Sequence, residues 1–299
     1  MKLKSIYLCM ALAILFAGCE QDGEYNPAKK IARIYKADRY QSGTSTPKHL
    51  SEVWNWDGNR LTSIDDYYYN SSTGKTTLST TTRFVYDGKK VSRIYYGDNA
   101  ETRITYNNDG YDKVTTYAEG ALVYDFKYTY KGGKVVKVDL TYYGTYGVPA
   151  KTMPMLSFFV PQSMAQDVTD KVAFCAAASS AKAAQSSVST WIYSFTYQGD
   201  NVSTMEYDEG TDGVRTFSFK YDTKNNPYYH SFQWIADPWP IPHSKNNVIE
   251  EARTNWDGEF VIDNYDYVYE GNWPIEERYA YRSGSYYSTS TTTTYYEYQ

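Results

Sequence analysis

Short runs in which aromatic and polar residues alternate dominate the sequence, and each run ends at a glycine turn. In one example, residues 84–88 read F-V-Y-D-G, and the apolar residues Val91 and Ile94 follow the turn. Asp-Gly between two alternating apolar runs is a strong β-hairpin signal, because a tight hairpin turn needs positive φ at its centre. We therefore predict two antiparallel strands joined by a type I′ turn, with positive φ at both Asp87 and Gly88.

The same pattern of an alternating run, a glycine turn and an apolar run recurs along the chain. Turns fall near residues 58, 88, 110, 132, 199, 226, 247 and 271, so the usual repeat is about 22 residues, or two strands and two turns. Short connections make neighbours in sequence neighbours in space. The pattern predicts an all-β antiparallel meander of repeated β-hairpins, forming a large twisted sheet, an open or closed barrel, or a solenoid-like stack. The last strand is expected at residues 292–298.

One interval between turns is too long for a single repeat, and it predicts an insertion at about residues 148–189. Part of the insertion is expected to be helical, because Asp167 or Thr169 could cap a helix with apolar residues on one side. The end of the insertion is almost all Ala and Ser. We expect a plug or lid over one end or face of the sheet, and a poorly ordered loop is the alternative.

The first residues predict export. Lys2 and Lys4 precede an apolar run at residues 6–16, which is too short to span a bilayer and is typical of a signal peptide. Leu-Phe-Ala-Gly then precedes Cys19, and this order resembles the lipobox of bacterial lipoproteins. The resemblance implies a signal peptide at residues 1–18 and a lipid on Cys19, with an ordinary leader as the alternative. The lipid would hold the protein at a membrane.

Residues 19–30 are expected to form a flexible acidic linker, and residues 31–299 a single β-hairpin-repeat domain with the insertion inside it. The acidic residues that follow Cys19 resemble the surface-export signal of some Gram-negative lipoproteins, although an ordinary acidic linker has the same composition. The expected location is therefore the outer membrane, with the protein at the cell surface or, alternatively, facing the periplasm.

The repeated phrase also resembles YD (RHS-like) repeats, which combine an aromatic-Tyr-Asp motif with a glycine and a hydrophobic residue. The best matches are residues 86–91 and residues 221–226, and the likeness covers roughly residues 50–145 and 190–280. Most units lack the full Tyr-Asp pair, and no self-cleavage segment or C-terminal toxin follows. As a whole, the chain is similar to Gram-negative surface lipoproteins with degenerate repeats of this kind. That resemblance implies an exported β-protein and carries no activity with it.

Composition narrows the possible partners and cofactors. Tyrosine is unusually frequent, at 35 of 299 residues. The formal net charge is −5, and a negative net charge argues against nucleic acid as a partner. With Cys9 in the leader and Cys19 carrying lipid, only Cys175 remains, and one mature chain has no disulfide framework. The histidines are far apart in sequence and lack the spacing of a zinc site, so we expect no metal and no cofactor: His49, His230 and His243.

Three pairs of adjacent acidic residues are candidates for chemistry: Asp65-Asp66, Glu250-Glu251 and Glu276-Glu277. Adjacent residues on a strand point to opposite faces, so the members of a pair do not automatically act together. Glycoside hydrolysis needs two carboxyl groups about 5–10 Å apart across one cleft. We expect solvated strand charges here and no catalytic residue.

The strongest candidate for a binding surface is the proline-rich stretch around residues 234–243. The prolines hold this stretch extended and outside any central strand. Trp234 and Trp239, with Tyr228 and Tyr229 nearby in sequence, could form an aromatic platform for a sugar face or a protein. Alternatively, Trp239 covers one end of the sheet. The sequence favours non-catalytic binding of a glycan or an envelope protein, and a polysaccharide-acting hydrolase or lyase is the alternative.

Overall fold

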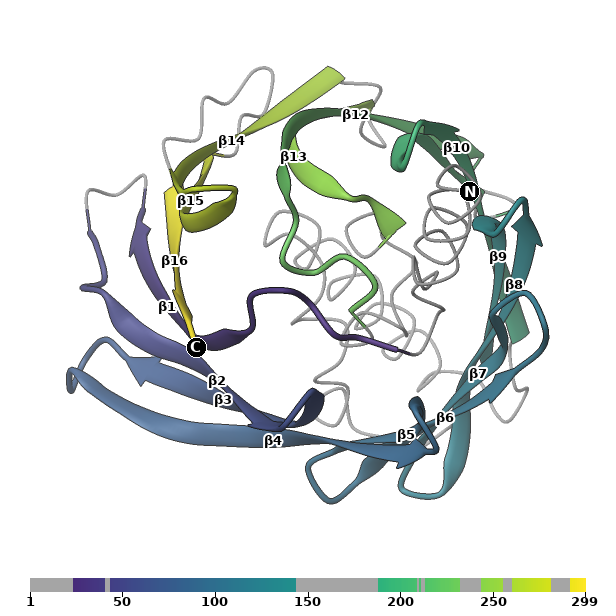
Figure 1. Cartoon of the computed structure of the whole chain (residues 1–299), viewed down its shortest axis with the longest axis horizontal. Helices are drawn as coiled ribbons and strands as arrows, with labels where there is room; N and C mark the ends of the chain where they lie inside the picture. Colours follow the sequence, from purple (N-terminus) through teal and green to yellow (C-terminus); the bar gives the residue numbers. More distant parts are fainter. Residues whose placement is uncertain are drawn as a thin grey trace, which may run out of the picture.

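The computed structural model describes residues 24–40, 44–143, 188–208, 210, 213–231, 243–254, 260–280 and 291–299. Sixteen antiparallel strands in this part of the chain follow one another around a closed barrel (Figure 1). The prediction of an all-β antiparallel meander is confirmed, and closure replaces the open alternatives. Among the described residues no helix has the length and apolar character needed to cross a bilayer. The insertion lies outside the described residues up to residue 187, and residues 188–189 begin a strand.

The strands have these bounds: β1 (Ile31–Arg39), β2 (His49–Asp57), β3 (Arg60–Asn70), β4 (Lys75–Asp87), β5 (Lys90–Tyr96), β6 (Ala100–Tyr106), β7 (Tyr111–Ala118), β8 (Ala121–Lys131), β9 (Lys134–Tyr143), β10 (Val188–Gln198), β11 (Asn201–Asp208), β12 (Val214–Asn225), β13 (Asn246–Thr254), β14 (Phe260–Glu270), β15 (Trp273–Ala280) and β16 (Thr291–Tyr298). The expected last strand is confirmed as β16. The ring closes where β1 pairs with β16, and the backbone N–H of Gln299 donates to the carbonyl of Lys30 at 3.0 Å.

The tight turn at residue 88 differs from the prediction in type. Asp87 pairs with Lys90 as the last residue of its strand, so Gly88 and Lys89 are the two central residues. Gly88 has a φ of 60°, and Glu119 and His230 alone among described non-glycine residues have positive φ. Positive φ at only the first central residue is the pattern of a type II′ turn, so the prediction of type I′ was wrong here.

In each hairpin, the incoming strand enters the tight turn and the outgoing strand leaves it. Each outgoing strand begins with a β-bulge, one residue after its first inward-facing residue. In β5 the register skips Ser92, so Val91 and Ile94, three residues apart, are both fully buried. A bulge adds one residue to a strand and increases its twist, which suits the rim of a barrel. The same spacing of three recurs in every odd-numbered strand, and it explains why the apolar residues after each turn do not alternate strictly.

Beyond each bulge, neighbouring hairpins separate and their backbones stop pairing. An aromatic side chain from the incoming strand fills the gap and bonds to the backbone of the preceding hairpin, as Tyr86 does to the Leu61 carbonyl at 2.8 Å. Such bonds satisfy backbone groups that the ladder leaves open. The eight side chains of this girdle, one for each gap around the barrel, are Trp56, Tyr86, Tyr106, Tyr130, Tyr197, Tyr221, Tyr267 and Tyr298.

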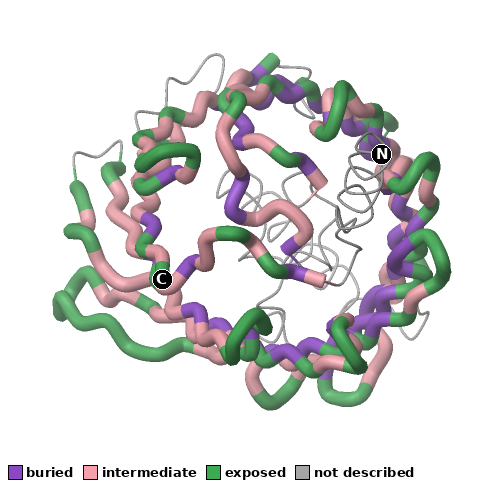
Figure 2. Tube along the Cα trace, viewed as in Figure 1, coloured by how far each residue is buried: buried purple, intermediate pink, exposed green. Residues whose placement is uncertain are grey.

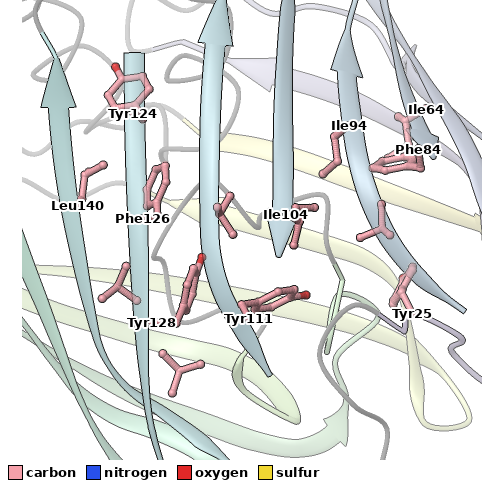
Figure 3. Packing of buried hydrophobic residues seen from close by; sticks show 14 of the residues in the cluster. Tyr25, Ile64, Phe84, Ile94, Ile104, Tyr111, Tyr124, Phe126, Tyr128 and Leu140 are labelled. Atoms are coloured by element: carbon pink, nitrogen blue, oxygen red, sulfur yellow. The ribbon is translucent and has the colours of Figure 1, made fainter. Parts of the chain in front are cut away.

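The apolar core lines the inside of the barrel. Buried residues recur around the whole ring (Figure 2), and among those with no exposed surface are Leu61, Val91, Val114 and Val202. Figure 3 shows Tyr124, Phe126 and Tyr128 on one face of β8, with aliphatic side chains of neighbouring strands on the same face.

Two described segments outside the strands lie within the ring (Figure 1). Residues 24–30 are the last part of the expected linker, and Tyr25 is only 3% exposed. Its hydroxyl donates to the carbonyl of Pro227 at 2.5 Å, and its ring centroid lies 5.7 Å from that of Trp56. Residues 24–30 and 226–231 therefore meet inside the barrel at the end that carries the tight turns.

Candidate functional site

The residues singled out from the sequence fall into two groups. Cys19, Trp234 and Trp239 lie outside the described residues. Tyr228 and Tyr229 are described, and both are partly buried inside the ring.

Tyr228 belongs to the interior of the barrel. Its ring centroid is 6.1 Å from that of Trp54 and 6.2 Å from that of Tyr296, and burial raises the pKa of its hydroxyl well above the usual range. The ring of Tyr229 lies 4.0 Å from that of His230. The structure thus places these two tyrosines among other aromatic rings within the barrel.

The histidines do not come together. His49 stacks on Tyr69 with ring centroids 4.5 Å apart, whereas the ring of His243 lies 5.9 Å from that of Phe195. Within the described part of the chain, no group of three His, Cys, Asp or Glu residues could hold a metal ion.

Each adjacent acidic pair is divided by the wall of the barrel. Glu250 pairs with Lys220 on the outside, with Nζ and Oε1 2.8 Å apart, whereas Glu251 is 1% exposed. In the same way, Glu276 contacts Arg278, and the neighbouring Glu277 accepts a hydrogen bond from the hydroxyl of Tyr296 at 2.7 Å. The expectation of solvated charges fails for the inward members Asp66, Glu251 and Glu277, because the bulges decide which member turns inward.

One inward-facing cluster holds two carboxyl groups side by side. Glu52 and Asp66 are direct partners in the register of β2 and β3. Trp54 Nε1 donates to Glu52 Oε2 at 2.8 Å. Burial and the charge of Glu52 together raise the pKa of Asp66 to about 8, although Lys36 lowers it. The fold therefore favours the protonated form of Asp66 more than an exposed aspartic acid would.

A second cluster is a buried ion triad. Arg253 Nη1 donates to Glu251 Oε1 and to Asp263 Oδ2, both at 2.5 Å, and all three side chains are at most 2% exposed. Burial raises the pKa of Glu251 to about 7, although Arg253 opposes this shift. Both carboxylates are held by one guanidinium, which is the arrangement that compensates buried charge in a structural ion pair.

The inner surface of β8–β11 forms an aromatic wall, defined by Tyr124, Tyr142, Trp191, Tyr193 and Tyr207. The ring centroids of Tyr124 and Tyr142 are 5.3 Å apart, and Tyr142 and Trp191 are nearly parallel, at 8° and 6.2 Å. Tyr193 stacks on Tyr207 at 4.7 Å.

Two solved structures resemble this barrel. A porin-like protein from Bacteroides uniformis ATCC 8492 covers 93% of this chain and 100% of its own, at 10% identity and a TM-score of 0.55. A porin-like protein from Bacteroides vulgatus ATCC 8482 covers 91% of this chain and 99% of its own, at 8% identity and a TM-score of 0.46. The first likeness supports the fold alone. No protein-family model matches the chain, and no curated protein sequence matches it.

The aromatic wall was not predicted from the sequence. Its members lie on strands that enter tight turns (Tyr124, Trp191 and Tyr193) and on strands that leave them (Tyr142 and Tyr207). Tyrosine also suits a solvated sheet surface, because its hydroxyl reaches water. The outgoing strands do carry a sequence signal. Two apolar residues three positions apart, such as Val91 and Ile94, mark the bulge and so indicate which residues face inward.

Proposed function

We propose that the chain is a lipid-anchored envelope protein whose barrel stays in water and binds a glycan or a partner protein without catalysis. In this proposal a lipid on Cys19 holds the protein at the outer membrane, with the barrel at the cell surface. The porin-like description of the structural neighbour fits an envelope location. The observation that carries the proposal is the distribution of charge between the two faces of the barrel wall.

Charged side chains cover the outside of the barrel. Arg33, Arg83, Arg103 and Lys113 are between 51% and 57% exposed, and Lys220 is 69% exposed. In a membrane barrel each Arg or Lys on the lipid face costs about 2–4 kcal/mol near the bilayer midplane. Membrane barrels are apolar outside and polar inside, whereas this barrel has its apolar core inside. The outer face therefore suits water and not lipid.

The interior also differs from that of a pore. A porin encloses a water-filled channel, whereas apolar side chains and the ring of Tyr25 are buried inside this barrel. Residues 24–30 and 226–231 occupy the interior at the end that carries the tight turns. This arrangement favours a binding role over the passage of solutes. The triad does not suit a hydrolase site, because both of its carboxylates are already held by Arg253.

The test is membrane fractionation of the full-length protein and of Cys19→Ser. We expect the wild type to require detergent and the variant to be recovered folded in detergent-free buffer, with a β-sheet circular dichroism spectrum. Cys175→Ser is the matched control, because it removes the other mature cysteine and should remain in the membrane fraction. A Cys19→Ser protein that still requires detergent would contradict the proposal.

A further inference from the structure

We infer that the aromatic wall on β8–β11 is a binding site for a neutral saccharide. This inference rests on the proposed binding function and names its ligand class. It is carried by three observations: aromatic rings gathered on the inner face of four neighbouring strands, the lack of buried charged residues on β6–β10, and a buried hydroxyl group that has no hydrogen-bond partner among the described residues.

The rings form one surface because their strands are neighbours and their residues are in register. Tyr124 pairs directly with Tyr142, and Tyr193 pairs directly with Tyr207. Trp191 follows the same inward face of β10, two residues before Tyr193. Flat aromatic faces bind the apolar C–H faces of sugar rings, and a row of them suits successive sugar units.

Charge separates this side of the barrel from the opposite side. Within the fully described strands β6–β10, no charged residue is buried, and the buried polar residues are threonines. Thr102 and Thr116 share a hydrogen bond between their hydroxyl groups at 2.9 Å, and Thr116 pairs with Tyr124 in the register. The buried ionisable groups Glu251, Arg253 and Asp263 lie on β13 and β14 (Figure 1). Charge reaches the wall at its β11 edge, where the Arg215 guanidinium lies over the Tyr207 ring at 5.5 Å. Hydroxyl groups and aromatic rings without charge fit a neutral, hydroxyl-rich ligand.

The Tyr124 hydroxyl is the polar group that points to a ligand. Tyr124 is 6% exposed, and no described residue lies within hydrogen-bond distance of its hydroxyl oxygen. Burial raises the pKa of this hydroxyl, which keeps it protonated and able to donate at neutral pH. Figure 3 shows it at the end of β8 away from Tyr111. Buried polar groups are normally paired, so a sugar hydroxyl would complete this one.

The position of the wall favours a saccharide over a protein. The wall lies on the inner side of a closed ring of strands, where a folded partner has no access. A protein partner would instead contact the outer face, which is charged.

The experiment is isothermal titration of the detergent-solubilised full-length protein with four neutral probes: cellohexaose, maltohexaose, xylohexaose and mannohexaose. We expect at least one probe to bind the wild type, Tyr124→Phe to weaken its affinity about tenfold, and Trp191→Ala to abolish measurable binding. Tyr68→Phe is the control, because Tyr68 is 61% exposed and lies on β3.

Thermal melting separates binding from stability. The Tyr124 hydroxyl has no described partner, so Tyr124→Phe should melt at or slightly above the wild-type temperature while losing affinity. Failure of all four probes to bind the wild type at millimolar concentration would overturn the inference, as would equal affinities for wild type and Tyr124→Phe. Either result leaves the Cys19→Ser fractionation unchanged, so failure of this inference is distinguishable from failure of the proposed function.

Discussion

At the scale of the residue, the girdle shows what a tyrosine contributes that a phenylalanine cannot. Each gap between hairpins leaves a backbone group without a ladder partner, and the gap is too wide for a short side chain to cross. A tyrosine buries its ring against the core and still reaches that group with its hydroxyl, as Tyr106 does to the Val91 carbonyl at 2.5 Å. Phenylalanine would fill the same space and leave the carbonyl unsatisfied.

We expect Tyr86→Phe to lower the free energy of unfolding by about 1–3 kcal/mol, because the Leu61 carbonyl loses its partner. Urea denaturation followed by circular dichroism measures the change. Tyr68→Phe on the outer surface removes a hydroxyl of the same kind from an exposed ring and should leave the midpoint almost unchanged. If the two substitutions have equal effects, the girdle bond does not contribute to stability.

At the scale of the element, adjacent hairpins are joined by cations as well as by rings. Arg60 Nη2 donates to the Gly88 carbonyl of the next turn at 2.7 Å, and its guanidinium lies over the Tyr86 ring at 5.4 Å. Lys30 repeats this arrangement toward Gly58, at 2.6 Å. The carbonyl of each of these two turns therefore accepts a hydrogen bond from the segment that precedes it, so a change in the turn backbone would also disturb that contact.

We expect Gly88→Val to destabilise the protein by about 1–3 kcal/mol through backbone strain alone. A Cβ on Gly88 would meet no atom within 4 Å, so steric contact contributes nothing, while its φ of 60° is unfavourable for a β-branched residue. Gly88→Asn is the control, because asparagine adopts this conformation more readily and should cost less. Thermal melts of the two variants check the difference. Equal losses would mean that the backbone conformation at Gly88 is not the cause.

The hairpins were predictable from sequence, whereas the closure and the site were not. Alternation and glycine are local signals, so strands such as β4 and β5 follow from them. The pairing of β1 with β16 depends on how many hairpins accumulate and how far each one twists, and no single repeat carries that information. The turn type was wrong because Asp87 is a paired strand residue. The inward direction of Glu251 depends on a bulge one residue wide, which reverses every side chain after it.

At the scale of the whole molecule, the barrel has a charged exterior and an interior with an uneven distribution of ionisable groups. The aromatic wall on one side is neutral, whereas Asp66, Glu251 and Glu277 face inward elsewhere. Burial raises the pKa of all three carboxyl groups. Stability should therefore depend on pH in a direction opposite to that of a protein held together by surface ion pairs.

We expect the free energy of unfolding to fall as pH rises from about 4 to about 8. Asp66 has a pKa of about 8 when folded against an ordinary value of 3.8, so in this window the folded state holds a proton that the unfolded state releases. Asp66→Asn should make the decline between pH 5 and pH 8 smaller, measured by urea denaturation at both values. Asp98→Asn, whose carboxylate is 96% exposed, is the control. An unchanged slope in Asp66→Asn would contradict the assignment.

The pairing of β1 with β16 also sets an order of events during synthesis. β1 is among the first strands to leave the ribosome, and β16 is the last. One edge of β1 can pair with β2 early, but the other keeps its N–H and C=O groups open until residues 291–298 have emerged. An open strand edge is a template for pairing with another chain. That edge of β1 therefore stays open to pairing with another chain until β16 closes the barrel.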